Sequence, residues 1–177
     1  MFEFMTVREL YEMVMSGAEF ETESLEYVEL DGWVRTNRDN GKVGFLALND
    51  GTYFRNCQIV YLKETLEDYD TIKHISTGSA IRVLGKFKLT PESKQPFEIE
   101  ATQIVVEGAC DDDFPLQKKR HSFEYMREIP HLRPRANTFY AIFRLRSVLS
   151  MAIHEFFQSQ GFVYVHTPLI TGNDGEG

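Results

Sequence analysis

Four side chains between residues 31 and 61 have the chemistry needed to bind an unstacked nucleic-acid base. They are Trp33, Arg35, Phe45 and Gln58. An aromatic ring can stack on a base, an amide can form hydrogen bonds with a base edge, and a guanidinium group can hold a phosphate. The combination indicates recognition of single-stranded nucleic acid, provided that the side chains share one surface.

The local sequence predicts three strands that would bring these side chains to one face of a sheet. Apolar residues alternate with them in each stretch: Val28, Leu30 and Val34, then Leu46 and Leu48, then Cys57, Ile59 and Tyr61. Because successive side chains of a strand point to opposite faces, the apolar set would form half a core and the other set would face outward. Alternation alone leaves a second interpretation open, in which a neighbouring loop covers Phe45.

The order of the predicted elements is typical of one small barrel. A capping-box pattern precedes a predicted helix over residues 7–16. After the three strands, residues 62–75 have the apolar spacing of a helix, and residues 79–89 and 97–106 are two further predicted strands joined by a proline-containing loop. Three strands, a helix and two strands is the order of an OB-fold, a five-stranded Greek-key barrel that commonly binds oligonucleotides. The predicted fold class is therefore mainly β.

The expected barrel covers residues 21–110 and follows an N-terminal helix and connection over residues 1–20. Two glycines interrupt its predicted strands, Gly44 and Gly85. A small barrel needs tight curvature at such points, although a glycine inside a strand can equally mark a bulge. Five histidines and two cysteines show no ligand spacing, so no metal site is expected, and Cys57 is predicted to be a buried thiol.

The charge of this 177-residue chain is unevenly distributed. The net charge is −8, but residues 1–113 carry −11 and residues 114–177 carry +3. A nucleic acid would therefore meet a local basic surface rather than a basic protein. No apolar stretch approaches the roughly 20 residues of a membrane span, and the chain does not open with a signal-peptide pattern, so we expect a cytoplasmic protein.

The composition changes after the barrel. Residues 111–136 swing from acidic to basic, contain three prolines and lack strand alternation, so we interpret them as a hinge. Residues 137–160 form a long predicted helix with a wide apolar stripe, Gly161 ends it, and residues 162–170 are a predicted strand. These two elements carry more apolar surface than they can bury on themselves, so we expect another subunit or further chain to cover it.

Several motifs make the chain similar to a known family. The runs KKRHSFEYMREIPHLRPRAN and FFQSQGFVYVHTPLITGNDGEG resemble asparaginyl-tRNA synthetases, which are class II aminoacyl-tRNA synthetases of the aspartate, asparagine and lysine subgroup. GWVRTNRD and GFLALNDG resemble the anticodon-binding barrel of that subgroup. The resemblance runs from about residue 28 to the last residue, and the hinge sequence favours the asparaginyl over the aspartyl type.

The resemblance implies roles for individual residues. Four matched positions engage the anticodon bases in the family: Arg38, Phe45, Gln58 and Glu100. Three possible additional RNA contacts do not come from the resemblance: Trp33 and Arg35, which the alternation places on the outer face, and Arg55, which lies in an apparent short insertion relative to the aspartyl type. Three other residues belong to the first class II motif, which builds a homodimer interface: Phe157, Phe162 and Pro168. Glu176 matches a glutamate that contacts the ammonium group of the amino-acid substrate.

The family joins asparagine to tRNA(Asn) with ATP, and Mg²⁺ bridges the ATP phosphates. The FRxE motif and the glycine-rich arginine motif that bind ATP are absent from these 177 residues. We therefore expect an N-terminal portion of the ligase that is inactive by itself and holds no cofactor, with residues 137–177 as the start of the catalytic domain. Three alternatives stay open: a stand-alone OB-fold binder of single-stranded nucleic acid, an aspartyl-type relative, and a paralogue with another role.

Overall fold

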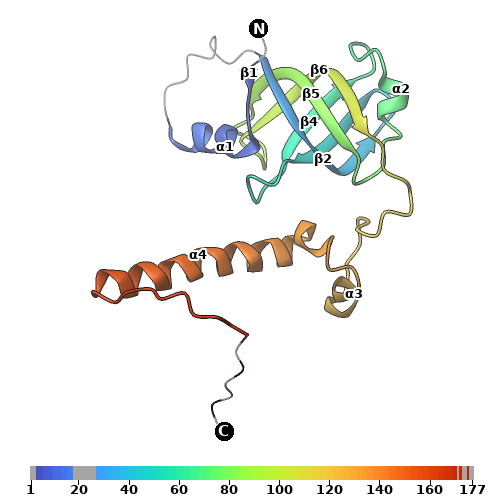
Figure 1. The fold of residues 1–177 in the computed structure, drawn as a ribbon. Helices are drawn as coiled ribbons and strands as arrows, with labels where there is room; N and C mark the ends of the chain where they lie inside the picture. Colours follow the sequence, from blue (N-terminus) through green and yellow to red (C-terminus); the bar gives the residue numbers. More distant parts are fainter. Residues whose placement is uncertain (1–2, 18–26, 171, 173–174, 176–177) are drawn as a thin grey trace. The chain divides into compact units, whose positions relative to one another are not determined.

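The computed structural model describes residues 3–17, 27–170, 172 and 175, and their elements are labelled in Figure 1. In chain order these are β1 (Glu3–Phe4), α1 (Val7–Met15), β2 (Tyr27–Asp39), β3 (Val43–Asn49), β4 (Cys57–Leu62), α2 (Tyr69–Ile72), β5 (Ala80–Leu89), β6 (Phe97–Gly108), α3 (Phe123–Glu128), the 3-10 helix η1 (Arg133–Arg135) and α4 (Asn137–Ser159). The chain divides into two compact units, residues 1–132 and residues 133–177.

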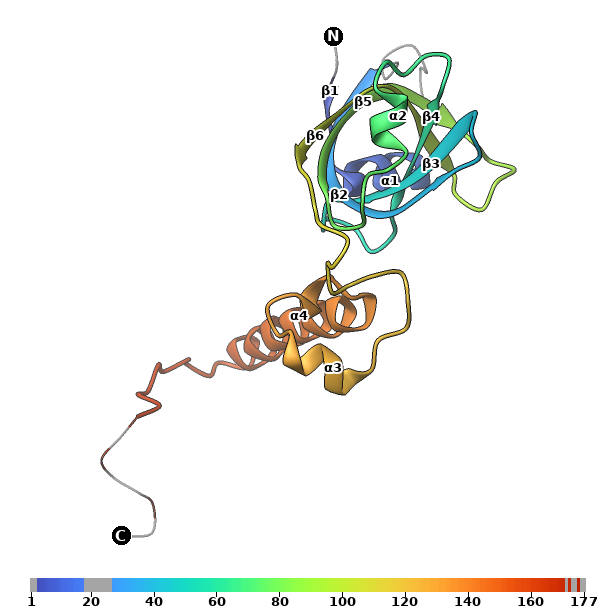
Figure 2. The same ribbon diagram turned by 90° about the vertical axis from the view of Figure 1, so that its right-hand side faces the viewer.

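The first unit is a closed barrel, which confirms the predicted OB-fold. Its sheet order is β1-β2-β3-β4-β6-β5, and β2 also pairs with β5. The first half of β2 lies antiparallel to β5 and the second half lies antiparallel to β3, so that one long strand closes the barrel (Figure 2). The pairs are antiparallel except β1 with β2 and β4 with β6. The short strand β1 was not predicted.

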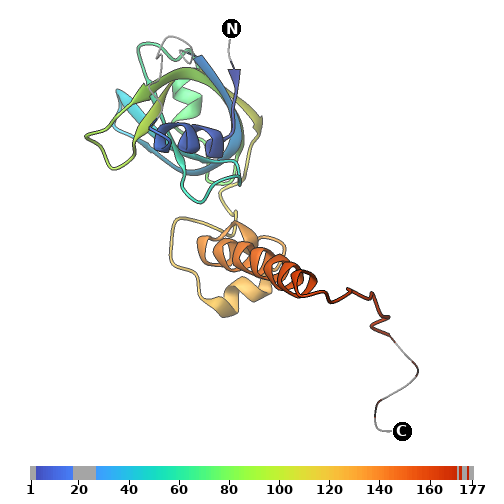
Figure 3. The same cartoon turned by 90° about the vertical axis from the view of Figure 1, so that its left-hand side faces the viewer.

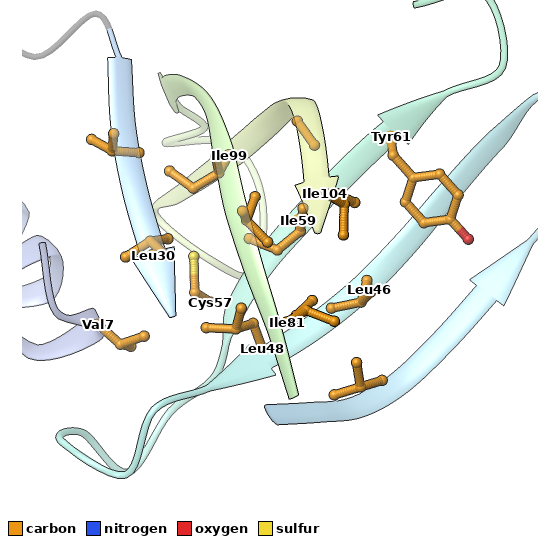
Figure 4. Close-up of a cluster of buried hydrophobic side chains, with 14 of the residues drawn as sticks. Val7, Leu30, Leu46, Leu48, Cys57, Ile59, Tyr61, Ile81, Ile99 and Ile104 are labelled. Atoms are coloured by element: carbon orange, nitrogen blue, oxygen red, sulfur yellow. The ribbon is translucent and has the colours of Figure 1, made fainter. Parts of the chain in front are cut away.

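The apolar residues that alternate along the strands fill the barrel, as the sequence predicted. Figure 4 shows part of this core, with Val7 from α1 near Leu30 and Cys57, and with Tyr61 farther along the barrel. Val28, Leu30, Leu48, Cys57, Ile59, Tyr61, Val83 and Ile99 are among the residues that are at most 1% exposed. Burial raises the pKa of the Cys57 thiol, so this group stays protonated at neutral pH.

The first turn of helix α1 is stabilised by a capping box and by a loop that is distant in sequence. Thr6 Oγ1 accepts a hydrogen bond from the Glu9 N–H, and the Glu9 carboxylate accepts one from the Thr6 N–H. The Val7 N–H donates to Asp50 Oδ2 at 2.8 Å, and the Arg8 N–H donates to Thr52 Oγ1 at 3.1 Å. All four backbone donors that the first turn leaves unpaired therefore have partners, and two of these partners lie in the loop between β3 and β4.

Helices α1 and α2 cover opposite ends of the barrel (Figures 1 and 3). At one end, Tyr11 of α1 stacks on Tyr53 with ring centroids 4.6 Å apart and meets Phe97 edge-on at 4.8 Å. At the other end, Tyr69 of α2 lies 5.4 Å from the ring of Tyr61. Each end of the core is therefore closed by an aromatic side chain from a helix.

The predicted helix over residues 62–75 is much shorter in the structure, where only Tyr69–Ile72 is helical. The physical reason is that β4 continues through Leu62, so the chain must first leave the sheet in a turn. Leu66, Tyr69 and Ile72 are nevertheless buried, as their spacing indicated. A turn and a single helical turn achieve the burial that a longer helix was expected to provide.

Gly44 and Gly85 lie where the barrel interior or a neighbouring strand leaves no room for a side chain. A Cβ at Gly44 would lie 1.9 Å from Cζ of Tyr61, and a Cβ at Gly85 would lie 2.5 Å from the carbonyl oxygen of Glu100. Gly85 also adjoins a register shift between β5 and β6. Both interpretations of a strand glycine thus occur in this barrel, since Gly44 allows close packing and Gly85 accompanies a bulge.

The segment between barrel and long helix contains local structure that the sequence reading missed. Ser122 caps the N-terminus of helix α3, because its hydroxyl accepts a hydrogen bond from the Tyr125 N–H at 3.2 Å. Met126 of this helix is buried. In the second unit, the Arg133 guanidinium lies 5.4 Å from the ring centroid of Phe139. The region expected to be a hinge therefore includes a capped helix and a cation–π contact.

Helix α4 ends as predicted, at Gly161 with φ +85°. The Gly161 N–H donates to the Gln158 carbonyl at 3.0 Å, and the Phe162 N–H donates to the Phe157 carbonyl at 3.1 Å. The rings of Phe157 and Phe162 pack with centroids 5.4 Å apart. This hydrogen-bond pair and apolar contact define a Schellman motif, which stops the helix without any help from another element.

The strand predicted over residues 162–170 is wrong, because the structure has no strand there. A strand obtains its hydrogen bonds from a neighbouring strand, and none of the described residues supplies one to this segment. Leu169 and Ile170 are 98% and 94% exposed.

Within the described residues, no helix combines the length and apolar character of a membrane span.

Replacing Gly44 with alanine should destabilise the barrel, because the new Cβ would overlap the ring of Tyr61. We expect Gly44→Ala to lower the free energy of unfolding by about 1–3 kcal/mol, the usual cost of overpacking a core. Gly108→Ala is the matched control, since its nearest neighbour, Ala80 Cβ, lies 3.8 Å away. Urea denaturation of both variants checks this, and equal stability of the two would contradict the tight packing at Gly44.

Candidate nucleic-acid interface

The outer face of the barrel brings together the four residues that the resemblance assigns to the anticodon. Arg38 is paired with Phe45, Phe45 with Val60, and Val60 with Glu100, across β2, β3, β4 and β6. Directly paired residues point to the same side of a sheet, so these side chains form one row. Gln58 lies two residues from Val60 on β4 and faces the same way.

A bulge in β2 places Arg38 in this row. Val34 faces the core, and strict alternation would also turn Arg38 inward, four residues later. The register of β2 against β3 shifts between Val34 and Thr36, so that Arg35 is an additional residue. One extra residue reverses the side of everything that follows, which brings Arg38 to the outer face opposite Phe45.

The end of β2 next to Arg38 is anchored from inside the barrel. Asn37 Nδ2 donates to the Ile72 carbonyl at 2.8 Å, and the Tyr61 hydroxyl donates to Asn37 Oδ1 at 2.8 Å. The Tyr69 hydroxyl donates to Asp39 Oδ2. Burial raises the pKa of Tyr61 to about 12 and that of Tyr69 to about 12. Both phenols are therefore protonated donors at neutral pH, and they hold the backbone on either side of Arg38.

The row combines an open cation, a half-buried ring and paired polar groups. Arg38 is exposed, and within the described part of the chain its guanidinium has no hydrogen-bond or ion-pair partner. Phe45 is half-buried. The Glu100 carboxylate pairs with the Lys88 ammonium, and the Gln58 amide donates to Glu98 at 3.2 Å. A base stacked on Phe45 would thus lie between a cation and hydrogen-bonding groups.

Not every basic residue of the strands contributes to this surface. Arg82 on β5 is held by Asp31, whose carboxylate accepts at 2.9 Å, and by Glu29 and Glu107 at 3.3 and 3.9 Å. The hydrogen bond and charge of Asp31, followed by the other two carboxylates, raise the pKa of Arg82. Its charge is already balanced locally, so a phosphate would gain little from it. The Lys86 ammonium lies 5.3 Å from the ring centroid of Tyr27.

The three possible additional RNA contacts do not lie beside Phe45. Trp33 is paired with Asn49, four residues along β3 from Phe45, which is a separation of about 13 Å. Arg35 is the extra residue of the bulge. Arg55 is exposed in the loop between β3 and β4. The sequence predicted that Trp33, Arg35, Phe45 and Gln58 lie together on one face. The structure brings Phe45 and Gln58 close to each other. It places Trp33 toward the other end of the face.

The remaining predicted site residues belong to the second unit. Phe157 and Phe162 are 47% and 63% exposed, and Pro168 is also exposed. Glu176 lies outside the described residues. The described residues contain no group of three or more possible metal ligands. The roles of all these residues, and the absence of a metal site, stay predictions.

Two supporting residues were missed by the sequence reading. Asn37 joins β2 to α2, and Glu98 contacts Gln58. Glu98 could have been noticed, because it lies between the apolar residues Phe97 and Ile99 and so must face outward, as Gln58 does. Asn37 could not, because its place inside the barrel depends on the bulge.

The similarity of this chain to known proteins agrees with this geometry. Residues 28–107 match the family described as an OB-fold nucleic acid binding domain, tRNA anti-codon type. The barrel is therefore similar to OB-fold nucleic acid binding domains. The match covers the five barrel strands from β2 to nearly the end of β6.

The chain is also a homologue of asparagine–tRNA ligases. It is 60% identical over 146 residues to the asparagine–tRNA ligase of Acetivibrio thermocellus, covering 82% of this chain and 32% of that protein. It is 55% identical over 150 residues to the enzyme of Alkaliphilus oremlandii, covering 85% and 32%. A solved structure, asparaginyl-tRNA synthetase from Pyrococcus horikoshii complexed with asparaginyl-adenylate, has a TM-score of 0.78 at 28% identity, covering 87% of this chain and 36% of that one. The chain thus spans about a third of the length of these relatives.

Phe45→Ala is expected to weaken RNA binding without unfolding the barrel, because Phe45 faces away from the core residues Leu46 and Leu48. The loss of one stacked base should cost about 1–3 kcal/mol in binding to an anticodon stem-loop. Leu46→Ala is the matched control and should lower the melting temperature instead, since Leu46 is 1% exposed. A large drop in the melting temperature of Phe45→Ala with unchanged RNA affinity would show that Phe45 is a core residue.

Proposed function

We propose that this chain is the tRNA-anticodon-binding portion of an asparagine–tRNA ligase, together with the start of the catalytic region. The observation that carries the proposal is the row Arg38, Phe45, Val60 and Glu100, with Gln58 beside it, in a chain that is 60% identical over 146 residues to one such ligase. The resemblance assigned four of these residues to the anticodon, and the strand register supports that assignment by placing them on one face.

The chemistry of the row suits the recognition of an anticodon. Bases of a single-stranded loop can be splayed outward, so that one stacks on Phe45 while Gln58 and Glu100 hydrogen-bond with base edges. Arg38, whose guanidinium only donates hydrogen bonds, would contact an accepting atom of another anticodon base. The net charge of −8 does not oppose this function, because Arg38 is exposed on the face itself.

The whole enzyme would join asparagine to tRNA(Asn) in the cytoplasm. ATP and asparagine would form an adenylate with release of pyrophosphate, and the asparaginyl group would pass to the terminal ribose of the tRNA. Mg²⁺ would bridge the ATP phosphates. The two motifs that bind ATP in the family are absent from these 177 residues, so this chain would bind the tRNA but would not activate asparagine. Glu176 would contact the ammonium group of asparagine in the whole enzyme.

A binding comparison tests the anticodon assignment. We expect the 177-residue chain to prefer a stem-loop with the anticodon GUU over a stem-loop of the same length with a scrambled loop by about tenfold or more, since base-edge hydrogen bonds carry specificity. Fluorescence anisotropy at one fixed salt concentration measures both affinities, because phosphate contacts depend strongly on salt. Equal affinity for both stem-loops and for unstructured oligonucleotides would instead favour a stand-alone binder of single strands.

We further propose that the second unit forms the interface of a homodimer. Several large apolar side chains of this unit are more than half exposed: Leu145, Val148, Leu149, Met151, Phe156, Phe162, Val163 and Val165. So many exposed large apolar side chains are uncommon on a soluble monomer. An isologous contact around a two-fold axis would let the same surface, including Phe157 and Pro168, cover itself.

Truncation should change the state of association. We expect the 177-residue chain to associate in a concentration-dependent manner, and a version that ends at Leu132, the end of the first compact unit, to remain monomeric. Sedimentation velocity over a wide concentration range compares the two. If the longer chain sediments as a monomer throughout, the apolar surface of α4 does not act as a subunit interface.

A further inference from the structure

The outer face contains a side-chain pair whose polarity determines what it can recognise. Gln58 Nε2 donates a hydrogen bond to Glu98 Oε2 at 3.2 Å. Gln58 belongs to β4 and Glu98 to β6, which are paired in parallel at Ile59 and Ile99. Ile59 and Ile99 are fully buried, so the residues that precede them, Gln58 and Glu98, both face outward.

The contact with Glu98 fixes which end of the Gln58 amide faces a ligand. An ionised carboxylate can only accept hydrogen bonds, whereas an amide group has one donating and one accepting end. The hydrogen-bond network therefore assigns the NH₂ group of Gln58 to the Glu98 side. The second N–H of this NH₂ group lies at the same end of the amide, and the carbonyl oxygen, Oε1, is the accepting end that remains for another partner.

A second carboxylate extends this arrangement along β6. Glu100 follows Glu98 on the same face and is paired with Val60, two residues from Gln58. The Lys88 ammonium contacts Oε2 of Glu100, which leaves Oε1 as an acceptor. Gln58, Glu98 and Glu100 thus present accepting oxygen atoms on β4 and β6. The ring of Phe45 lies beside them, because Phe45 on β3 is paired with Val60 on β4.

We propose that Glu98 is a positioning residue that orients the Gln58 amide so that this face selects bases with an imino N–H. This inference rests on the proposed function. Guanine and uracil carry a donating N–H on the ring nitrogen of their Watson–Crick edge, whereas adenine and cytosine carry an accepting nitrogen there. An accepting nitrogen opposite Gln58 Oε1 leaves both atoms without a donor, and unpaired polar groups of this kind are costly. The GUU anticodon consists only of imino N–H bases.

The inference is tested with the 177-residue chain and a panel of anticodon stem-loops. The panel contains GUU, each single replacement by adenine or cytosine, and loops in which 3-methyluridine or 1-methylguanine blocks the imino nitrogen. Gln58→Ala identifies the position that Gln58 reads, because discrimination should fall there. We expect the wild-type chain to lose about tenfold or more in affinity when that base is methylated or replaced by cytosine or adenine.

Two substitutions remove the orienting contact in different ways. Glu98→Met has no acceptor for the Gln58 NH₂ group, and Glu98→Gln can donate as well as accept, so either end of the Gln58 amide can face the ligand. The matched control is Glu92→Met, which removes the same charge from the exposed loop between β5 and β6. Circular dichroism melting confirms that each variant is folded.

We expect Glu98→Met to reduce discrimination at the position read by Gln58 by about fivefold or more, while its affinity for GUU changes about as much as that of Glu92→Met. Glu98→Gln should show a smaller reduction at the same position. If Glu98→Met keeps the full wild-type discrimination while Gln58→Ala loses it, Glu98 does not orient the amide and the inference is overturned. A wild-type chain that does not distinguish GUU from a scrambled loop would overturn the proposed function itself, before any variant is measured.

Discussion

The outer face of the barrel depends on one constraint, which is that a single strand must close the barrel on both sides. Strand β2 pairs with β5 through its first half and with β3 through its second half. Side chains along the whole length of β2 must therefore pack into the core while the strand changes its partner from β5 to β3. The bulge at Arg35 makes this turn possible, because it bends the strand and changes the side on which later residues lie. Arg38 reaches the outer face only as a result of this change.

Residues in the interior of the barrel hold the strand segment that carries Arg38 in place. Gly44 leaves space for the ring of Tyr61, and the hydroxyl of Tyr61 reaches Asn37, the residue next to Arg38. Asn37 in turn bonds to the Ile72 carbonyl of α2. The buried polar groups of this chain of contacts are thus paired with one another, so the arrangement is held without leaving an unsatisfied donor or acceptor at Asn37. The position of an exposed arginine is therefore determined by residues of the core.

Much of this arrangement follows from local rules, and the rest does not. Alternation located the core positions of the barrel strands, and the capping box and Gly161 located helix ends, because each of these signals lies within a few neighbouring residues. Alternation also placed Phe45 and Gln58 on one face. The assignment of Arg38 and Glu100 came from the family resemblance instead, since a bulge and a register between distant strands leave no local pattern. The strand expected over residues 162–170 failed for a related reason: its sequence favours a strand, but a strand also needs a partner.

The hydrogen bonds of the first turn of α1 limit how the loop between β3 and β4 can vary in evolution. Surface loops usually tolerate insertions and deletions. The loop after β3 is different, because Asp50 and Thr52 accept the backbone N–H groups of Val7 and Arg8, more than forty residues earlier in the chain. A residue gained or lost between Asn49 and Cys57 would move these acceptors away from the helix. Changes in loop length are therefore tied to changes in the N-terminal helix, and the two segments should vary together.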